Sequence, residues 1–207
     1  MGSTSPLRKE EPIRDEPVNI GDRAIDNVRY IREMMERSAS FTAVPGYGGM
    51  LMGVTAVAAA YISNMQVYVV DALAVWLVEG CLAFSIGLLA MWQKSKISGG
   101  SLLSTPARKF AIGFAPPLIV GVIVVLGLWK NGHYYVMAPV CISAYGAAVV
   151  CGGAFSARAV PIMGWCFIAL GAVAFALPTS YGNFMMGAAF GLLHIIFGAI
   201  IARKYGG

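Results

Sequence analysis

Long apolar runs separated by short polar segments occupy most of the chain after residue 40. A helix needs about 20 mostly apolar residues to cross about 30 Å of hydrocarbon. Six runs have about this length: Phe41–Ser63, Val69–Trp92, Phe110–Trp129, Tyr134–Gly152, Ala159–Pro178 and Asn183–Ala202. The pattern predicts an all-α fold, a polytopic transmembrane helical bundle of six spans that occupies residues 41–207.

A different pattern precedes the first run. Residues 1–21 carry three prolines, mixed charge and few large apolar groups, so we expect a disordered tail there. In residues 22–38 apolar side chains recur every three or four positions, which predicts an amphipathic helix beside the membrane. The predicted docking face consists of Val28, Ile31 and Met35.

The charge of this predicted helix bears on what it binds. Helices that lie on a lipid surface are usually strongly basic. Residues 22–38 contain four basic and four acidic side chains, so anionic headgroups attract the segment little. We therefore favour docking on protein, either a partner or the cytoplasmic ends of this chain, over docking on lipid.

Composition agrees with a membrane protein. Of 207 residues, 58% are apolar and 12% are charged, and an ordinary soluble domain has about 25% charge. These values exclude a soluble globular domain, a disordered chain and a disulfide scaffold, and they imply a lipid bilayer as partner. The net charge of +5 comes from basic residues between the spans, so it does not indicate nucleic-acid binding.

Lys and Arg residues predict the orientation, because cytoplasmic loops carry an excess of them. With six spans, 14 of the 15 basic residues fall on the side of the two termini, and Lys130 alone falls on the other side. The prediction is that both termini lie in the cytoplasm.

Small residues recur one turn apart in the first and last spans, as Gly49 and Gly53 and as Gly187 and Gly191. Small faces let helix backbones approach closely where lipid gives no hydrophobic drive for association. They predict close packing, which can lie within one chain or between two copies. We favour packing within the chain.

Asp71 and Glu79 are the acidic residues within the spans. Asp71 lies near the outer end of the second span and is expected to be hydrated. Glu79 lies about 15 Å deep, and a carboxylate at that depth is costly. Tyr145 and His194 fall at a similar depth in the fourth and sixth spans.

Two interpretations of these polar groups stay open. Glu79, Tyr145 and His194 form a cluster in which Glu79 exchanges a proton, if the second, fourth and sixth spans face one another. Alternatively, each is a structural polar contact in a packed core, and they never meet.

Motifs for catalysis or metal binding are missing from the sequence. The four cysteines form no Cys-x-x-Cys pair, and a single histidine in the spans is too few for a two-ligand haem. The sequence also has no phosphate-binding loop, HExxH motif or nucleophile elbow. We expect no metal, no cofactor and no enzymatic activity.

The stretch from Val28 to Gly49, VRYIREMMERSASFTAVPGYGG, resembles the juxtamembrane entry of an uncharacterised bacterial family of polytopic membrane proteins. The resemblance covers this stretch alone and implies a bacterial cytoplasmic (inner) membrane, with no known activity. Our first functional hypothesis is an accessory or regulatory subunit that acts by association with a protein partner or with itself. The alternative is a small-solute or proton-coupled transporter built around Glu79 and His194.

Overall fold

The computed structural model describes residues 20–38, 44–97 and 103–206. The chain divides into two compact units, Met1–Ser38 and Ala39–Gly207. The first unit contains helix α1, Ile20–Ser38, and the second contains a helical bundle. The elements of the bundle are α2 (Gly46–Asn64), α3 (Val69–Ile97), α4 (Thr105–Lys130), η1 (Tyr134–Val136), α5 (Met137–Gly153), α6 (Ala159–Ala176), η2 (Thr179–Tyr181), α7 (Gly182–Met186), η3 (Gly187–Leu193) and α8 (His194–Tyr205).

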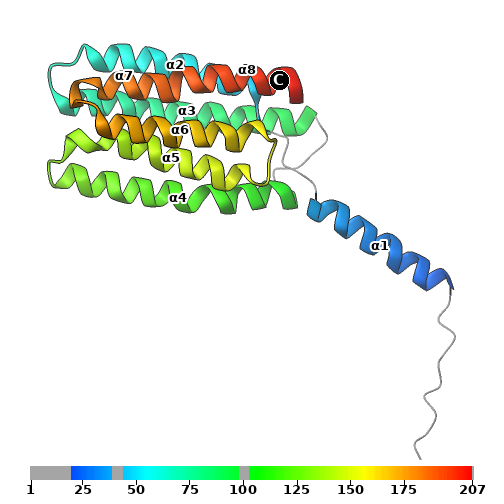
Figure 1. Ribbon diagram of the computed structural model, residues 1–207. Helices are drawn as coiled ribbons and strands as arrows, with labels where there is room; N and C mark the ends of the chain where they lie inside the picture. Colours follow the sequence, from blue (N-terminus) through cyan, green and yellow to red (C-terminus); the bar gives the residue numbers. More distant parts are fainter. Residues whose placement is uncertain (1–19, 39–43, 98–102, 207) are drawn as a thin grey trace, which may run out of the picture. The chain divides into compact units, whose positions relative to one another are not determined.

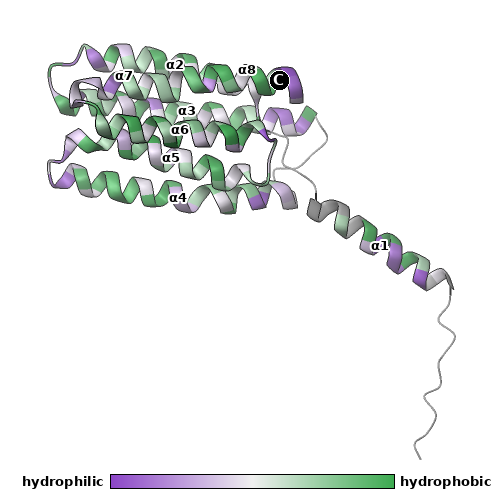
Figure 2. Cartoon of the chain, viewed as in Figure 1, coloured by the Kyte–Doolittle hydropathy of each residue, from purple (hydrophilic) through white to green (hydrophobic). Residues whose placement is uncertain are grey.

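Six helical segments of the bundle are long and apolar enough to cross a membrane, so the chain is a multi-pass membrane protein. Hydrophobic residues predominate along these segments, and hydrophilic residues lie mostly at their ends (Figure 2). The predicted all-α fold with six spans is confirmed to this extent. Part of the predicted first span, residues 41–43, and the tail, residues 1–19, lie outside the described residues.

Helix ends differ from the predicted span ends because helices continue past the apolar core. Helix α3 extends five residues beyond Trp92, to Ile97, and α4 begins at Thr105 rather than Phe110. Lys and Arg are good helix formers, and their long stems let the charge reach water. Pro106 also fits the start of α4, where the missing amide hydrogen is not needed.

The sixth span contains a feature that hydrophobic periodicity does not indicate. Helix α7, the π-helical segment η3 and α8 follow one another directly from Gly182 to Tyr205. We call this continuous span the last helix. In a π-helical segment each backbone hydrogen bond spans one residue more than in an α-helix. The residues that follow the segment therefore lie on a different face of the helix. His194 is the first residue after it.

The bundle is held by a few pairs of adjacent helices. Helix α2 packs against α3 and against the last helix, and α5 packs against α4 and α6. Helix α4 lies along one edge of the bundle, next to α5 (Figure 1). Helices α3 and α4 are the most exposed spans, because only 6% of the most apolar stretch of each is buried within the protein.

Glycines allow α2 and the last helix to touch through their backbones. A Cβ atom on Gly53 would lie 2.6 Å from the Gly191 carbonyl oxygen, and one on Gly187 would lie 2.8 Å from Ala60 Cβ. Gly49 is less tight, because its Cβ would lie 3.5 Å from Gly198 Cα. The structure therefore places Gly49, Gly53, Gly187 and Gly191 between two helices of the same chain.

Helices α5 and α6 approach each other in the same way. A Cβ atom on Gly146 would lie 2.9 Å from the Gly164 carbonyl oxygen, and one on Gly164 would lie 2.9 Å from the Gly146 carbonyl oxygen. A Cβ atom on Gly113 of α4 would lie 2.7 Å from the Cys151 carbonyl oxygen of α5. Three helix pairs therefore pack closely because glycine has no side chain: α2 with the last helix, α5 with α6, and α4 with α5.

Pro116 and Pro117 lie inside α4, and the helix continues through both. They line an apolar groove of about 480 Å³ whose other walls come from α4, α5 and Phe175 of α6. A proline in a helix frees a backbone carbonyl, and membrane helices tolerate this when local structure compensates. The pair therefore shapes a lipid-facing surface of α4 without breaking the helix.

Helix α1 has apolar and charged sides. Ile25, Val28 and Ile31 are each more than half exposed. On its charged side Arg29 forms an exposed ion pair with Asp26 at 3.4 Å. The Met35 side chain, the third member of the predicted docking face, lies outside the described residues.

Candidate functional site

Tyr145 and His194 meet inside the bundle. Tyr145 lies on α5 and His194 begins α8, and the Tyr145 hydroxyl and His194 Nε2 form a hydrogen bond of 2.8 Å. His194 is buried, with 6% of its surface exposed. Two of the three residues that the sequence singles out are therefore in direct contact.

Aromatic rings enclose this pair. The Tyr145 ring centre lies 4.9 Å from that of Phe167 and 5.1 Å from that of Phe190, and Phe167 is fully buried. Phe114 meets Tyr145 edge-on at 6.1 Å. These five residues, Phe114, Tyr145, Phe167, Phe190 and His194, form what we call the aromatic cluster. It joins α4, α5, α6 and the last helix.

The second ring nitrogen of His194, Nδ1, is buried and has no hydrogen-bond partner among the described residues. A neutral imidazole has one N–H donor and one acceptor nitrogen. Nε2 is paired with the Tyr145 hydroxyl, so the unpaired group of the ring is Nδ1, which lies in apolar surroundings. The pair is held by this one hydrogen bond, and no described carboxylate bonds to it.

Glu79 lies in a different contact, between α3 and α2. It is 7% exposed, and its Oε1 lies 2.8 Å from the Thr55 hydroxyl oxygen. That hydroxyl also lies 2.9 Å from the Met52 carbonyl oxygen. A protonated Glu79 donating to Thr55, which in turn donates to Met52, would satisfy every hydrogen in this chain of contacts. We call Glu79 and Thr55 the carboxyl pair.

The proposed meeting of Glu79 with Tyr145 and His194 does not occur, since none of the hydrogen bonds of the described bundle joins it to either. Depth along the span places all three at a similar level, but it does not fix which neighbour each helix faces. Helix α3 packs on α2, whereas Tyr145 faces α6 and the last helix.

A third polar contact is one that the sequence pattern does not predict. The Asn183 side-chain oxygen accepts a hydrogen bond from the Trp76 indole nitrogen at 3.0 Å and lies 3.0 Å from the Ser63 hydroxyl. Ser63 is 1% exposed. These residues join α2, α3 and α7. Ser63 and Asn183 both lie at the ends of predicted spans. Polar residues at span ends are expected to contact water or headgroups, so the sequence does not indicate that these two are in contact inside the bundle.

Lys94 joins segments that are far apart in the sequence. Its ammonium donates hydrogen bonds to the Val44 carbonyl oxygen at 3.0 Å and to the Gly206 carbonyl oxygen at 2.5 Å. It therefore ties the end of α3 to the residues before α2 and after α8, and both chain ends of the bundle lie at one end of it. Asp71 lies in the first turn of α3 and is exposed.

Among the described residues, no three His, Cys, Asp or Glu side chains lie together where they could hold a metal ion. The four cysteines are free thiols. The polar contacts of Glu79, His194 and Asn183 are hydrogen bonds between single side chains. Comparison of the chain with protein-family models, curated proteins and solved structures finds no match.

Changing Tyr145 to Phe tests whether the hydrogen bond to His194 supports the fold. The hydroxyl would be lost and both nitrogens of His194 would be unpaired, which should cost about 1–3 kcal/mol of stability. The measurement is the midpoint of thermal unfolding in detergent, with Tyr61→Phe as the control because Tyr61 is 66% exposed.

Combining Tyr145→Phe with His194→Leu removes both hydrogen-bonding partners and should recover part of the lost stability. Equal midpoints for Tyr145→Phe and Tyr61→Phe would show that the hydrogen bond contributes nothing.

Proposed function

We propose that this integral membrane protein acts by association, as an accessory or regulatory subunit of a larger membrane assembly. Helix α1 is the observation that carries the proposal. Its apolar residues Ile25, Val28 and Ile31 are more than half exposed, on a helix of balanced charge. Such a face gains little from anionic lipid, and burying it against protein would stabilise a complex.

The bundle supports the same proposal. Its helices touch through glycine backbones and through the aromatic cluster, so side chains fill the space around His194. Two hollows of the described bundle open at its surface, one beside Pro116 and one beside Trp129. Neither is lined by Glu79, Tyr145 or His194. A packed interior suits a subunit that holds others in place.

We further infer that the protein lies in a bacterial cytoplasmic membrane with both termini inside. Lys94, Arg108, Arg158 and Arg203 belong to helices and connections at one end of the bundle, the end where Val44 and Gly206 meet Lys94. An excess of basic residues favours the cytoplasmic side. The bacterial source rests on the resemblance of the stretch from Val28 to Gly49.

Hydrogen exchange of α1 tests the association proposal. In liposomes that contain the purified full chain alone, the amides of residues 20–38 should exchange fast. In the complex purified intact from native membranes they should be protected, because a partner covers Val28 and Ile31. Protection in the liposomes without a partner would mean that α1 rests on lipid or on its own bundle, and would contradict the proposal.

A variant pair makes the test specific to the apolar face. Val28→Glu with Ile31→Glu removes two aliphatic contacts of about 1.5–3 kcal/mol each, so binding should weaken by about a hundredfold or more. Tyr30→Glu adds a charge on another side of the same helix and should leave binding intact.

A proton-coupled transporter is the second candidate, and the burial of Glu79 against Thr55 favours it. A transporter would move protons or a coupled solute across liposomes, and Glu79→Gln would abolish that flux while Asp71→Asn would retain it. The association proposal predicts no flux from the unmodified chain. Flux that depends on Glu79 would replace the first proposal with the second.

A further inference from the structure

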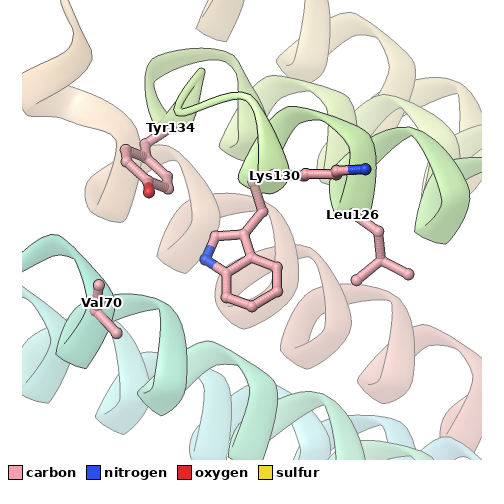
Figure 3. A pocket seen from close by; sticks show the side chains of 5 residues that line it. Val70, Leu126, Lys130 and Tyr134 are labelled. Atoms are coloured by element: carbon pink, nitrogen blue, oxygen red, sulfur yellow. The ribbon is translucent and has the colours of Figure 1, made fainter.

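A groove lies between α3 and the end of α4. Its walls are Val70 of α3, Leu126, Trp129 and Lys130 of α4, and Tyr134 of η1. Its volume is about 550 Å³. In Figure 3 Val70 lies on α3 and Tyr134 lies across the gap from it, while Leu126 and Lys130 lie farther along α4. We call it the Trp129 groove.

The described bundle does not fill this groove. Helix α3 packs on α2 and α4 packs on α5, so the facing sides of α3 and α4 lack a tight contact at this level. Val70, Leu126 and Trp129 are each more than half exposed. At a span end these apolar walls meet the acyl chains of the bilayer, so an acyl chain is the group best suited to occupy the groove.

Three hydrogen-bond donors stand around the groove. The Lys130 ammonium, the Trp129 indole N–H and the Tyr134 hydroxyl form no hydrogen bond or ion pair with any described residue. Lys130 is also the one basic residue at this end of the described bundle, since the other seven lie at the opposite end. A group with negative charge and several acceptor oxygens matches this set of donors.

Trp and Tyr side chains prefer the level of the lipid headgroups, because each has an apolar body and a polar tip. Trp129 and Tyr134 therefore place the groove where a headgroup meets its acyl chains. In Figure 3 the Tyr134 side chain lies above Val70, and the Lys130 side chain extends along α4 on the side away from Val70. The walls below them are apolar, which suits a diacyl lipid better than a free phosphate.

We propose that the Trp129 groove binds an anionic phospholipid. Its phosphodiester accepts hydrogen bonds from Lys130, Trp129 and Tyr134, and one acyl chain lies between Val70 and Leu126. The bound lipid fills the contact that α3 and α4 do not make with each other. This binding site is independent of any partner of α1.

Native mass spectrometry of the full chain in mild detergent tests the proposal. Phosphatidylglycerol should be retained more strongly than phosphatidylcholine with the same acyl chains. Lys130→Gln should lower retention of phosphatidylglycerol about fivefold, the effect of one lysine near a headgroup. Lys130→Arg should keep it, because the charge remains.

Lys204→Gln is the matched control, because it removes the same charge from an exposed lysine at the opposite end of the bundle. It should not change retention. Equal losses for Lys130→Gln and Lys204→Gln, or no loss for Lys130→Gln, would overturn the proposal.

Asp71 gives an independent check, because it follows Val70 and its carboxylate would repel a phosphodiester. Asp71→Asn should raise retention of phosphatidylglycerol. A decrease would mean that no phosphodiester lies near Asp71, and it would argue against the proposal. Inorganic phosphate should not displace the lipid, and displacement would mean that the groove recognises phosphate without acyl chains.

Discussion

Direct contact between helix backbones, made possible by glycine, is the constraint on which this bundle depends. Lipid tails are as apolar as leucine, so burial of apolar side chains gives membrane helices no drive to associate. Van der Waals contact must replace that drive, and it grows when backbones approach closely. Gly53 with Gly191, and Gly146 with Gly164, leave no room for a Cβ atom. These contacts bring the last helix against α2 and join α5 to α6.

The polar groups follow from these pairings. Two buried polar groups of the described residues bond across helix contacts: Glu79 with Thr55 between α3 and α2, and His194 with Tyr145 between α8 and α5. Asn183 forms hydrogen bonds with Ser63 of α2 and with Trp76 of α3. In hydrocarbon an unpaired polar group is costly, so such bonds help to fix which helices are neighbours. Among the described side chains, His194 Nδ1 is buried without a hydrogen-bond partner.

Hydrophobic periodicity predicts how many helices cross the membrane and roughly where they end, since each span needs a fixed apolar length. It also predicts the depth of a residue, which is why Tyr145 and His194 were placed at one level. It does not predict the direction in which a residue faces. Glu79 therefore pairs with Thr55 instead, and the π-helical segment before His194, which turns the helix, leaves no signature in the sequence.

The stability of two glycine variants tests the dependence on backbone contact most directly. A Cβ atom on Gly53 would lie 2.6 Å from the Gly191 carbonyl oxygen, whereas one on Gly80 would meet nothing within 4 Å. In detergent, Gly53→Ala should lose about 1–3 kcal/mol through overpacking, and Gly80→Ala should be unchanged or slightly more stable because alanine favours helix. Equal stability of the two variants would contradict the account.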